Sequence, residues 1–94
     1  MSTEIVIPHA LELKPLGQWG NEDVVMLLLE NNHNINLDDD DMGAIKSGKI
    51  NGFALLGLTI GDLWALPLPV GPARNVFQLI QALKEKKGLL YASK

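Results

Sequence analysis

Between Ile50 and Leu83, short apolar groups alternate with residues that begin or end helices, and this spacing limits the possible folds more than any other part of the sequence. Leucine pairs are separated by glycine, threonine and proline at intervals of a few residues. An amphipathic segment from Arg74 to Lys87 follows them. This alternation predicts several short helices followed by one long helix, in a small all-α domain.

The sequence before Ile50 predicts two helices. The segment from Asn21 to Asn31 combines an acidic first turn with apolar residues and then turn-forming residues, so negative charge lies at the positive end of the helix dipole. In the next segment Asp38 is the predicted N-cap, Asp41 occupies the N3 position, and Ser47-Gly48 ends the helix. Both helices are expected to be short.

Three more helices are predicted after these. A very short one covers Phe53 to Leu56. Thr59 and Asp62 then form a capping box, in which each side chain accepts a hydrogen bond from the other residue's backbone N–H, and the helix that it opens must end by Pro67. Gly71-Pro72 begins the last and longest helix, since proline is pre-set for a first turn.

The composition limits the chain to one domain with a single core. The chain has 94 residues, of which 47% are apolar, and this size leaves little room for a deep catalytic cleft. No nucleophile is paired with a base in the manner of an enzyme, so the sequence predicts a binding module and no enzymatic activity. The net charge of -3 gives no long-range attraction to nucleic acid or to an anionic membrane.

Several features bear on cellular location. The chain has no cysteine, which excludes disulfides and thiolate metal sites. Its first residues lack the basic end and apolar core of a signal peptide, and no apolar run approaches the ~20 residues that a membrane span requires. We therefore expect a protein of the cytosol or the nucleus.

The ends of the chain are predicted to lie outside the helical domain. Residues 1–16 are interpreted as an extended N-terminal arm, because a β-prone run is ended by Pro8. Residues 17–87 form the domain and residues 88–94 a C-terminal tail. The arm is expected to lie on this domain or on a neighbour through its apolar residues, which are Ile5, Ile7, Leu11 and Leu13.

Three groups of residues resemble parts of ligand sites but fit structural explanations better. The segment from Gly43 to Ile50 resembles the sequence motif of a phosphate-binding loop. However, Ile50 stands where that motif has a serine or threonine, whose hydroxyl would hold Mg²⁺. Calcium binding at the aspartate run would place Lys49 where a bidentate glutamate is required. His9 and His33 have no second ligand or triad partner nearby and are expected at the surface. We expect no cofactor, no metal and no small-molecule substrate.

The combined spacing of these segments resembles the sterile alpha motif (SAM) domain family over about residues 17–87. Each motif is common by itself, and it is the spacing between the motifs that supports the resemblance. The matching motifs are Trp19-Gly-Asn-Glu-Asp-Val24, Ile50-Asn-Gly52, Leu55-Leu56, Leu58-Thr59, Asp62-Leu63, Leu66-Pro67-Leu68, Gly71, and the apolar triplet Val76, Ile80 and Leu83. The resemblance implies a five-helix SAM-like bundle, with Trp19 packed in the core.

The chain departs from the family pattern at three places. Pro67 replaces a glycine and the connection from Leu68 to Gly71 is about one residue short, so this junction is expected to have unusual geometry. Ala73 stands where a basic residue is common, with Arg74 one position later. The second helix lacks the aromatic that the family often buries, and the apolar residues expected to fill that space are Leu37, Met42 and Ile45.

In the SAM family two surfaces join head to tail, which implies that this chain is a protein interaction and oligomerisation module of a signalling or scaffold protein. Its partner would be another SAM domain or a second copy, giving dimers, open polymers or mixed complexes. The surface on the middle helices would consist of Asp38, Asp39, Asp40, Asp41, Asp62 and the partly exposed Trp64. The other surface would lie at the start of the last helix and consist of Gly71, Pro72, Arg74 and Asn75.

Three points stay open at this stage. The aspartate run serves as a helix cap and dipole partner, as an acidic docking patch, or as both. Some SAM domains bind RNA hairpins through basic residues, and here Arg74, Lys84, Lys86 and Lys87 stand on an acidic background, which makes nucleic acid the less favoured partner. The chain also fits a targeting or regulatory segment of a larger kinase or secreted effector.

Overall fold

The computed structural model describes residues 5–86 of the chain, and all regular structure in that range is helical. The prediction of an all-α fold is therefore confirmed. The described helices are α1 (His9–Glu12), the 3-10 helix η1 (Leu16–Gln18), α2 (Asn21–Glu30), α3 (Asn32–Ile35), α4 (Asp39–Ser47), α5 (Gly52–Leu56), α6 (Ile60–Ala65) and α7 (Val70–Lys86).

The predicted count of five helices is too low. The five expected helices are α2, α4, α5, α6 and α7, and their ends lie within a residue or two of the predicted bounds, apart from the C-terminal end of α7, which is not described. The additional helices α1 and α3 have four residues each. A single turn of helix is too short to show apolar periodicity, so the sequence pattern did not predict them.

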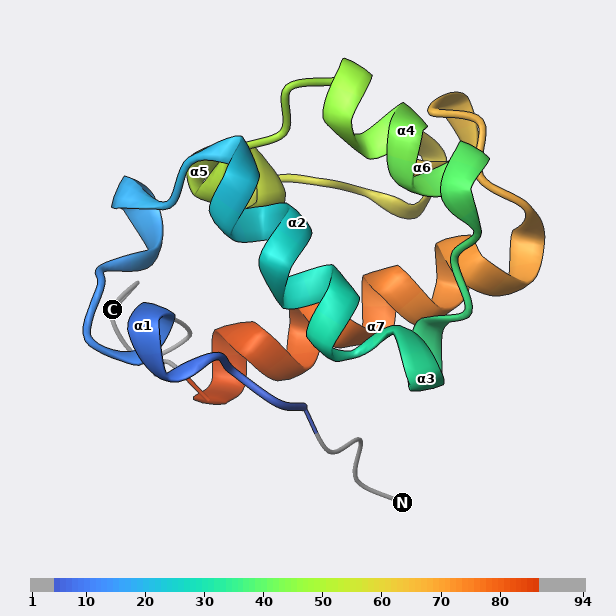
Figure 1. Cartoon of the computed structure of the whole chain (residues 1–94). Coiled ribbons are helices and arrows are strands. Elements are labelled where there is room, and N and C mark those ends of the chain that lie inside the picture. The colour runs from blue at the N-terminus through green and yellow to red at the C-terminus, as the bar shows by residue number, and fades with distance from the viewer. Residues whose placement is uncertain (1–4, 87–94) are drawn as a thin grey trace.

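The long helix α7 and the central helix α2 organise the bundle. Helix α7 packs against α3, α5 and α6, while α2 packs against α3, α4 and α5. In Figure 1, α7 lies along the lower side of the bundle and α4, α5 and α6 lie above it. The apolar stripe of α7 faces this arrangement through its buried residues, which are Ala73, Val76, Leu79, Ile80 and Leu83.

The core contains the residues that the family resemblance placed there. Trp19 is 1% exposed, and its indole Nε1–H donates to the Lys14 carbonyl oxygen at 3.0 Å. This satisfies the polar end of a buried tryptophan. Around α4, the place of the missing aromatic is taken by buried Leu37, Met42 and Ile45, as expected.

The predicted N-cap at Asp38 and the predicted capping box at Thr59 are both present, and Asp38 forms a capping box as well. At the start of α4, Asp38 Oδ1 accepts from the Asp41 N–H at 2.8 Å, and Asp41 Oδ2 accepts from the Asp38 N–H at 3.2 Å. At the start of α6, Thr59 Oγ1 accepts from the Asp62 N–H at 3.1 Å and Asp62 Oδ2 accepts from the Thr59 N–H at 3.0 Å. Each box satisfies backbone N–H groups that a helix start leaves without an internal partner.

The N-terminal arm is only partly extended. Residues 5–8 are extended, but α1 and η1 follow before residue 19. Ile5 and Leu11 are buried and Ile7 packs against the core, so the arm lies on its own domain. Leu13 was expected to pack as well, yet it is 88% exposed.

The side-chain amide of Asn31, at the end of α2, holds the arm in place. Its Oδ1 accepts from the Val6 N–H at 2.7 Å, and its Nδ2 donates to the Val6 carbonyl oxygen at 2.8 Å. A further hydrogen bond runs from Nδ2 to the Leu27 carbonyl oxygen at 2.8 Å. Asn31 is fully buried. The amide therefore pairs with the Val6 backbone much as a neighbouring strand would.

Helix α5 approaches η1 so closely that only glycine fits between them. The Gly52 N–H donates to the Trp19 carbonyl oxygen at 2.8 Å. A Cβ atom at position 52 would collide with the Leu16 carbonyl oxygen and lie 2.8 Å from Trp19 Cβ. The glycine in the Ile50-Asn-Gly52 motif is thus required by a backbone contact.

Helix α7 begins one residue before the predicted Gly71 start. Its first turn is closed by the Ala73 N–H, which donates to the Pro69 carbonyl oxygen at 2.9 Å. Pro72 lies in that turn, where an N–H would have no internal acceptor. The preceding junction contains a cis peptide bond between Leu66 and Pro67. The predicted stop at Lys87 and Gly88 and the tail 88–94 lie outside the described residues.

Candidate functional site

The aspartate run at the start of α4 divides into exposed and buried members. Asp38, Asp39 and Asp40 are exposed, whereas Asp41 is 8% exposed and uses its carboxylate in the capping box. Asp41 was predicted as part of the docking surface, and its burial removes it from that surface. The run serves as a helix cap through Asp38 and Asp41 and leaves Asp39 and Asp40 as outward-facing charges.

The two predicted surface residues of α6 are both exposed. Asp62 caps the helix through the Thr59 N–H and still faces solvent. Trp64 is 44% exposed, which agrees with the expectation that it points partly outward. Helix α6 packs on α7, and a short connection, residues 66–69, joins the two helices.

The start of α7 presents one cation and an apolar residue. Gly71 and Arg74 are exposed, and Pro72 is half-buried. Asn75 is also half-buried, and its Nδ2 donates to the Ile35 carbonyl oxygen at 3.4 Å, so it connects α7 to α3. Asn75 is therefore partly occupied by a contact within the domain, and Arg74 carries the charge of this surface.

The exposed acids of α4 and the exposed Arg74 belong to neighbouring parts of the fold. Helix α3 packs on α7 through the contact between Asn75 and Ile35, and Asp38 follows Ile35 by only three residues. Figure 1 shows the segment from α3 to α4 passing the first turns of α7. Helix α3 therefore connects the first turns of α7 to the segment that leads into the aspartate run.

Phe53 and Val70 are among the exposed apolar residues that the sequence analysis missed. Phe53 on α5 is 77% exposed and Val70, the first residue of α7, is 63% exposed. In α5 the inward positions belong to Gly52 and Leu55, so the intervening Phe53 faces outward. The spacing of these inward residues could have indicated that Phe53 is exposed. There was no such indication for Val70, because the predicted helix began after it.

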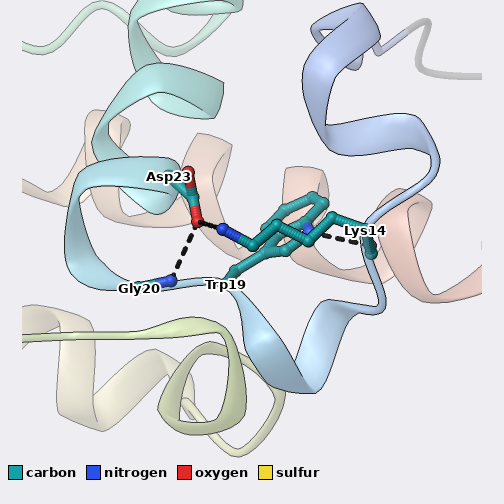
Figure 2. Close-up of polar contacts among 4 residues, drawn as sticks. All are labelled: Lys14, Trp19, Gly20 and Asp23. Atoms are coloured by element: carbon teal, nitrogen blue, oxygen red, sulfur yellow. Dashed lines mark hydrogen bonds and ion pairs between the residues drawn. The ribbon is translucent and has the colours of Figure 1, made fainter.

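A separate polar cluster joins the arm to the start of α2 (Figure 2). Lys14 Nζ lies 2.8 Å from Asp23 Oδ2, and the same oxygen accepts from the Gly20 N–H at 3.0 Å. The hydrogen bond from the Lys14 ammonium, together with that from the Gly20 N–H, lowers the pKa of the Asp23 carboxyl below its usual value. The charged form of Asp23 therefore stabilises the fold.

Replacing Asp23 with asparagine is expected to reduce stability at neutral pH by about 1 kcal/mol. Because the folded-state pKa of Asp23 is lowered, its contribution is present above the usual aspartate pKa of about 4 and is lost as the pH falls through the lowered value. Urea unfolding at several pH values should show the gap between the two proteins closing below about pH 4. Exposed Asp40, changed to asparagine, is the control, and a gap that stayed constant in acid would contradict the assignment.

No metal or membrane site is evident in the part of the chain that the structure describes. Residues 5–86 contain no group of three or more histidine, cysteine or acidic residues arranged to hold a metal ion. The His9 side chain is 93% exposed, with Nδ1 at 3.5 Å from Glu12 Oε1, and His33 is exposed too, so the surface position of both histidines is confirmed. Among the described helices, none is both long and apolar enough to cross a bilayer.

Comparison with protein families identifies the fold. A family model described as the SAM-like domain matches residues 1–82. The chain belongs to the SAM-like domain family. The resemblance drawn from the motifs is thereby confirmed, and the matched range includes the arm. Searches of curated proteins and of solved structures return no match. SAM-like domains are, in general, protein interaction modules without catalytic activity.

Proposed function

We propose that this SAM-like domain joins another SAM-like domain, or a second copy of itself, by head-to-tail contact. One contributor is the acidic surface, defined as Asp38, Asp39, Asp40, Asp62 and Trp64. The other is the α7 surface, defined as Val70, Gly71, Pro72, Arg74 and Asn75. The observation that carries the proposal is that the opposite charges, Asp39 and Asp40 against Arg74, are all exposed, as are the apolar residues Trp64 and Val70.

The charged and the apolar residues of these two surfaces would contribute differently to the association. Ion pairs between exposed side chains are worth about 0–1 kcal/mol, so Asp39, Asp40 and Arg74 mainly set orientation and association rate. Large apolar residues at the centre of an interface carry more of the affinity, which assigns the anchoring part to Trp64 and Val70. With a single arginine facing several acids, self-association is expected to be weak, and a partner with a more basic surface is expected to bind more tightly.

Charge reversal on either surface is expected to abolish the association. The variants Asp39→Lys/Asp40→Lys and Arg74→Glu should each be monomeric, because like charges then face one another across the joint. An equimolar mixture of the two should associate again, since lysine then meets glutamate at one joint and the native pair is present at the other. Light scattering over a range of protein and salt concentrations measures the average molar mass, which distinguishes monomers from associated chains.

The matched control is Glu30→Lys/Glu85→Lys, which changes the net charge by the same amount as the aspartate variant at exposed positions outside both surfaces. It should associate as the wild type does. A wild-type chain that is monomeric at millimolar concentration and low salt would exclude self-association and leave only a foreign partner. Association that survives both charge reversals would place the joint elsewhere.

A further inference from the structure

The chain contains one asparagine that is followed directly by glycine, and this pair, Asn51-Gly52, is chemically labile. In an asparagine-glycine pair the glycine nitrogen can attack the side-chain amide, because glycine has no Cβ to hinder the approach and its backbone adopts conformations closed to other residues. The sequence therefore contains a site of spontaneous deamidation. Whether this site reacts depends on how the fold holds the two residues.

The reaction converts asparagine and water into an acidic residue and ammonia. A base removes the Gly52 amide proton, and the nitrogen forms a bond with Asn51 Cγ. The bond from Cγ to Nδ2 breaks and ammonia leaves, taking up a proton, so that a succinimide ring remains. Water then opens the ring at one of its two carbonyl carbons. Attack at Cγ gives aspartate, whereas attack at the Asn51 backbone carbonyl carbon gives isoaspartate, in which the main chain runs through Cβ and Cγ.

The native structure holds both reacting groups in other contacts. Gly52 is buried and its N–H donates to the Trp19 carbonyl oxygen at 2.8 Å, so the proton that must leave is shielded from any base. The Asn51 side chain is the N-cap of α5, and its Oδ1 accepts from the Ala54 N–H at 2.8 Å. The reaction requires that both contacts be given up. They are released together when α5 separates from η1, on which it packs.

We propose that Asn51 is a modification site and that the contact of α5 with η1 controls its deamidation. The site is closed while Gly52 is docked, and it reacts in the fraction of molecules in which α5 is undocked. The rate of ammonia release at this site thus measures how often this part of the bundle opens. Neither residue belongs to the two surfaces proposed for association, so the deamidation does not require a partner.

The two products are expected to differ in their effect on the fold. Aspartate keeps the cap, because its carboxylate accepts from the Ala54 N–H as the Asn51 amide does. Isoaspartate adds a carbon atom to the main chain between two fixed residues. Before it, Ile50 is buried and its carbonyl oxygen accepts from Asn21 Nδ2 at 2.8 Å. After it, Gly52 lies so close to η1 that not even a Cβ atom fits. Isoaspartate therefore prevents α5 from docking, and the loss of ammonia makes the change irreversible.

The rate of deamidation in the full chain tests the control by the fold. The chain is incubated in mildly alkaline buffer, with and without enough urea to unfold it, and mass spectrometry of its peptides measures aspartate and isoaspartate at position 51. A synthetic peptide of residues 48–56 gives the rate of the unprotected pair in both buffers. The rate in the folded chain should be at least about 30-fold below that of the peptide, and in urea the two rates should agree. Equal rates for the folded chain and the peptide would overturn the proposal.

Refolding tests the different effects of the two products. After incubation in urea, the chain is returned to native buffer and treated briefly with a protease, which digests unfolded molecules. Molecules with aspartate at position 51 should survive as unmodified ones do, whereas those with isoaspartate should be digested at least about tenfold faster. Asn51→Ser is the matched control, because serine also caps a helix and has no amide to lose, so its refolding should not decline with incubation. Isoaspartate that is as abundant in the protease-resistant molecules as in the mixture before refolding would contradict the expected loss of docking.

Discussion

Replacing Gly52 with alanine is expected to lower the free energy of unfolding by about 2–4 kcal/mol, through steric overlap between α5 and η1. The added Cβ meets the Leu16 carbonyl oxygen, a backbone atom that cannot rotate away, and crowds Trp19 Cβ at 2.8 Å. Relief requires the two elements to separate, which also weakens the hydrogen bond from the Gly52 N–H to the Trp19 carbonyl oxygen. The total free energy of unfolding of a native domain is about 5–15 kcal/mol, so this loss is a large part of it.

Gly43 supplies the control for this substitution. It lies inside α4, and a Cβ there meets nothing within 4 Å. Gly43→Ala is expected to raise stability by about 0.5–1 kcal/mol, because alanine has the higher helix propensity. Urea unfolding of both variants measures the difference. If Gly52→Ala were as stable as the wild type, the close approach of α5 to η1 would be wrong.

Replacing Asn31 with alanine is expected to destabilise the domain by about 2–4 kcal/mol. The change removes three hydrogen bonds and leaves the Val6 N–H and the Leu27 and Val6 carbonyl oxygens without their side-chain partner. Water is expected to replace some of the lost hydrogen bonds, since Val6 is 46% exposed, and this reduces the loss of stability. The arm should then detach more readily than the rest of the domain unfolds.

Hydrogen exchange at the Val6 amide separates these two effects. In the Asn31→Ala variant that amide should exchange much faster than the amides of α2 and α7, because its only described acceptor is the Asn31 side chain. Asn34→Ala is the matched control, since Asn34 is exposed, and it should change stability by less than about 0.5 kcal/mol. A Val6 amide that remained protected in Asn31→Ala would show that the arm is held by other contacts.

The features predicted correctly from the sequence depend on residues close together in the chain. The N-cap at Asp38, which forms a capping box with Asp41, and the box formed by Thr59 with Asp62 each lie within four consecutive residues, and both helix starts were found as expected. The burial of Asp41 was missed, although the same capping box assigns its carboxylate to the backbone. The prediction of Asp41 as a surface charge did not consider that its Oδ2 accepts a hydrogen bond from the Asp38 N–H.

The features that were missed depend on residues far apart in the chain. Asn31 was interpreted as a turn residue that ends a helix, because nothing near it indicates a partner 25 positions away at Val6. The contact between Asn75 and Ile35 spans 40 positions, and it joins α7 to the short helix α3 that precedes the acids of α4. Charge can be counted in a sequence, but the position of each charged residue on the folded domain is decided by packing.

The shortness of most helices has a consequence for how the domain responds to a partner. Apart from α7, no described helix exceeds ten residues, and isolated helices shorter than about 12–15 residues are marginal in water. Each one persists only while its neighbours are in place, so we expect residues 5–86 to unfold as one cooperative unit. Binding at the start of α7 would then slow amide exchange throughout the bundle, including helices that the partner never touches.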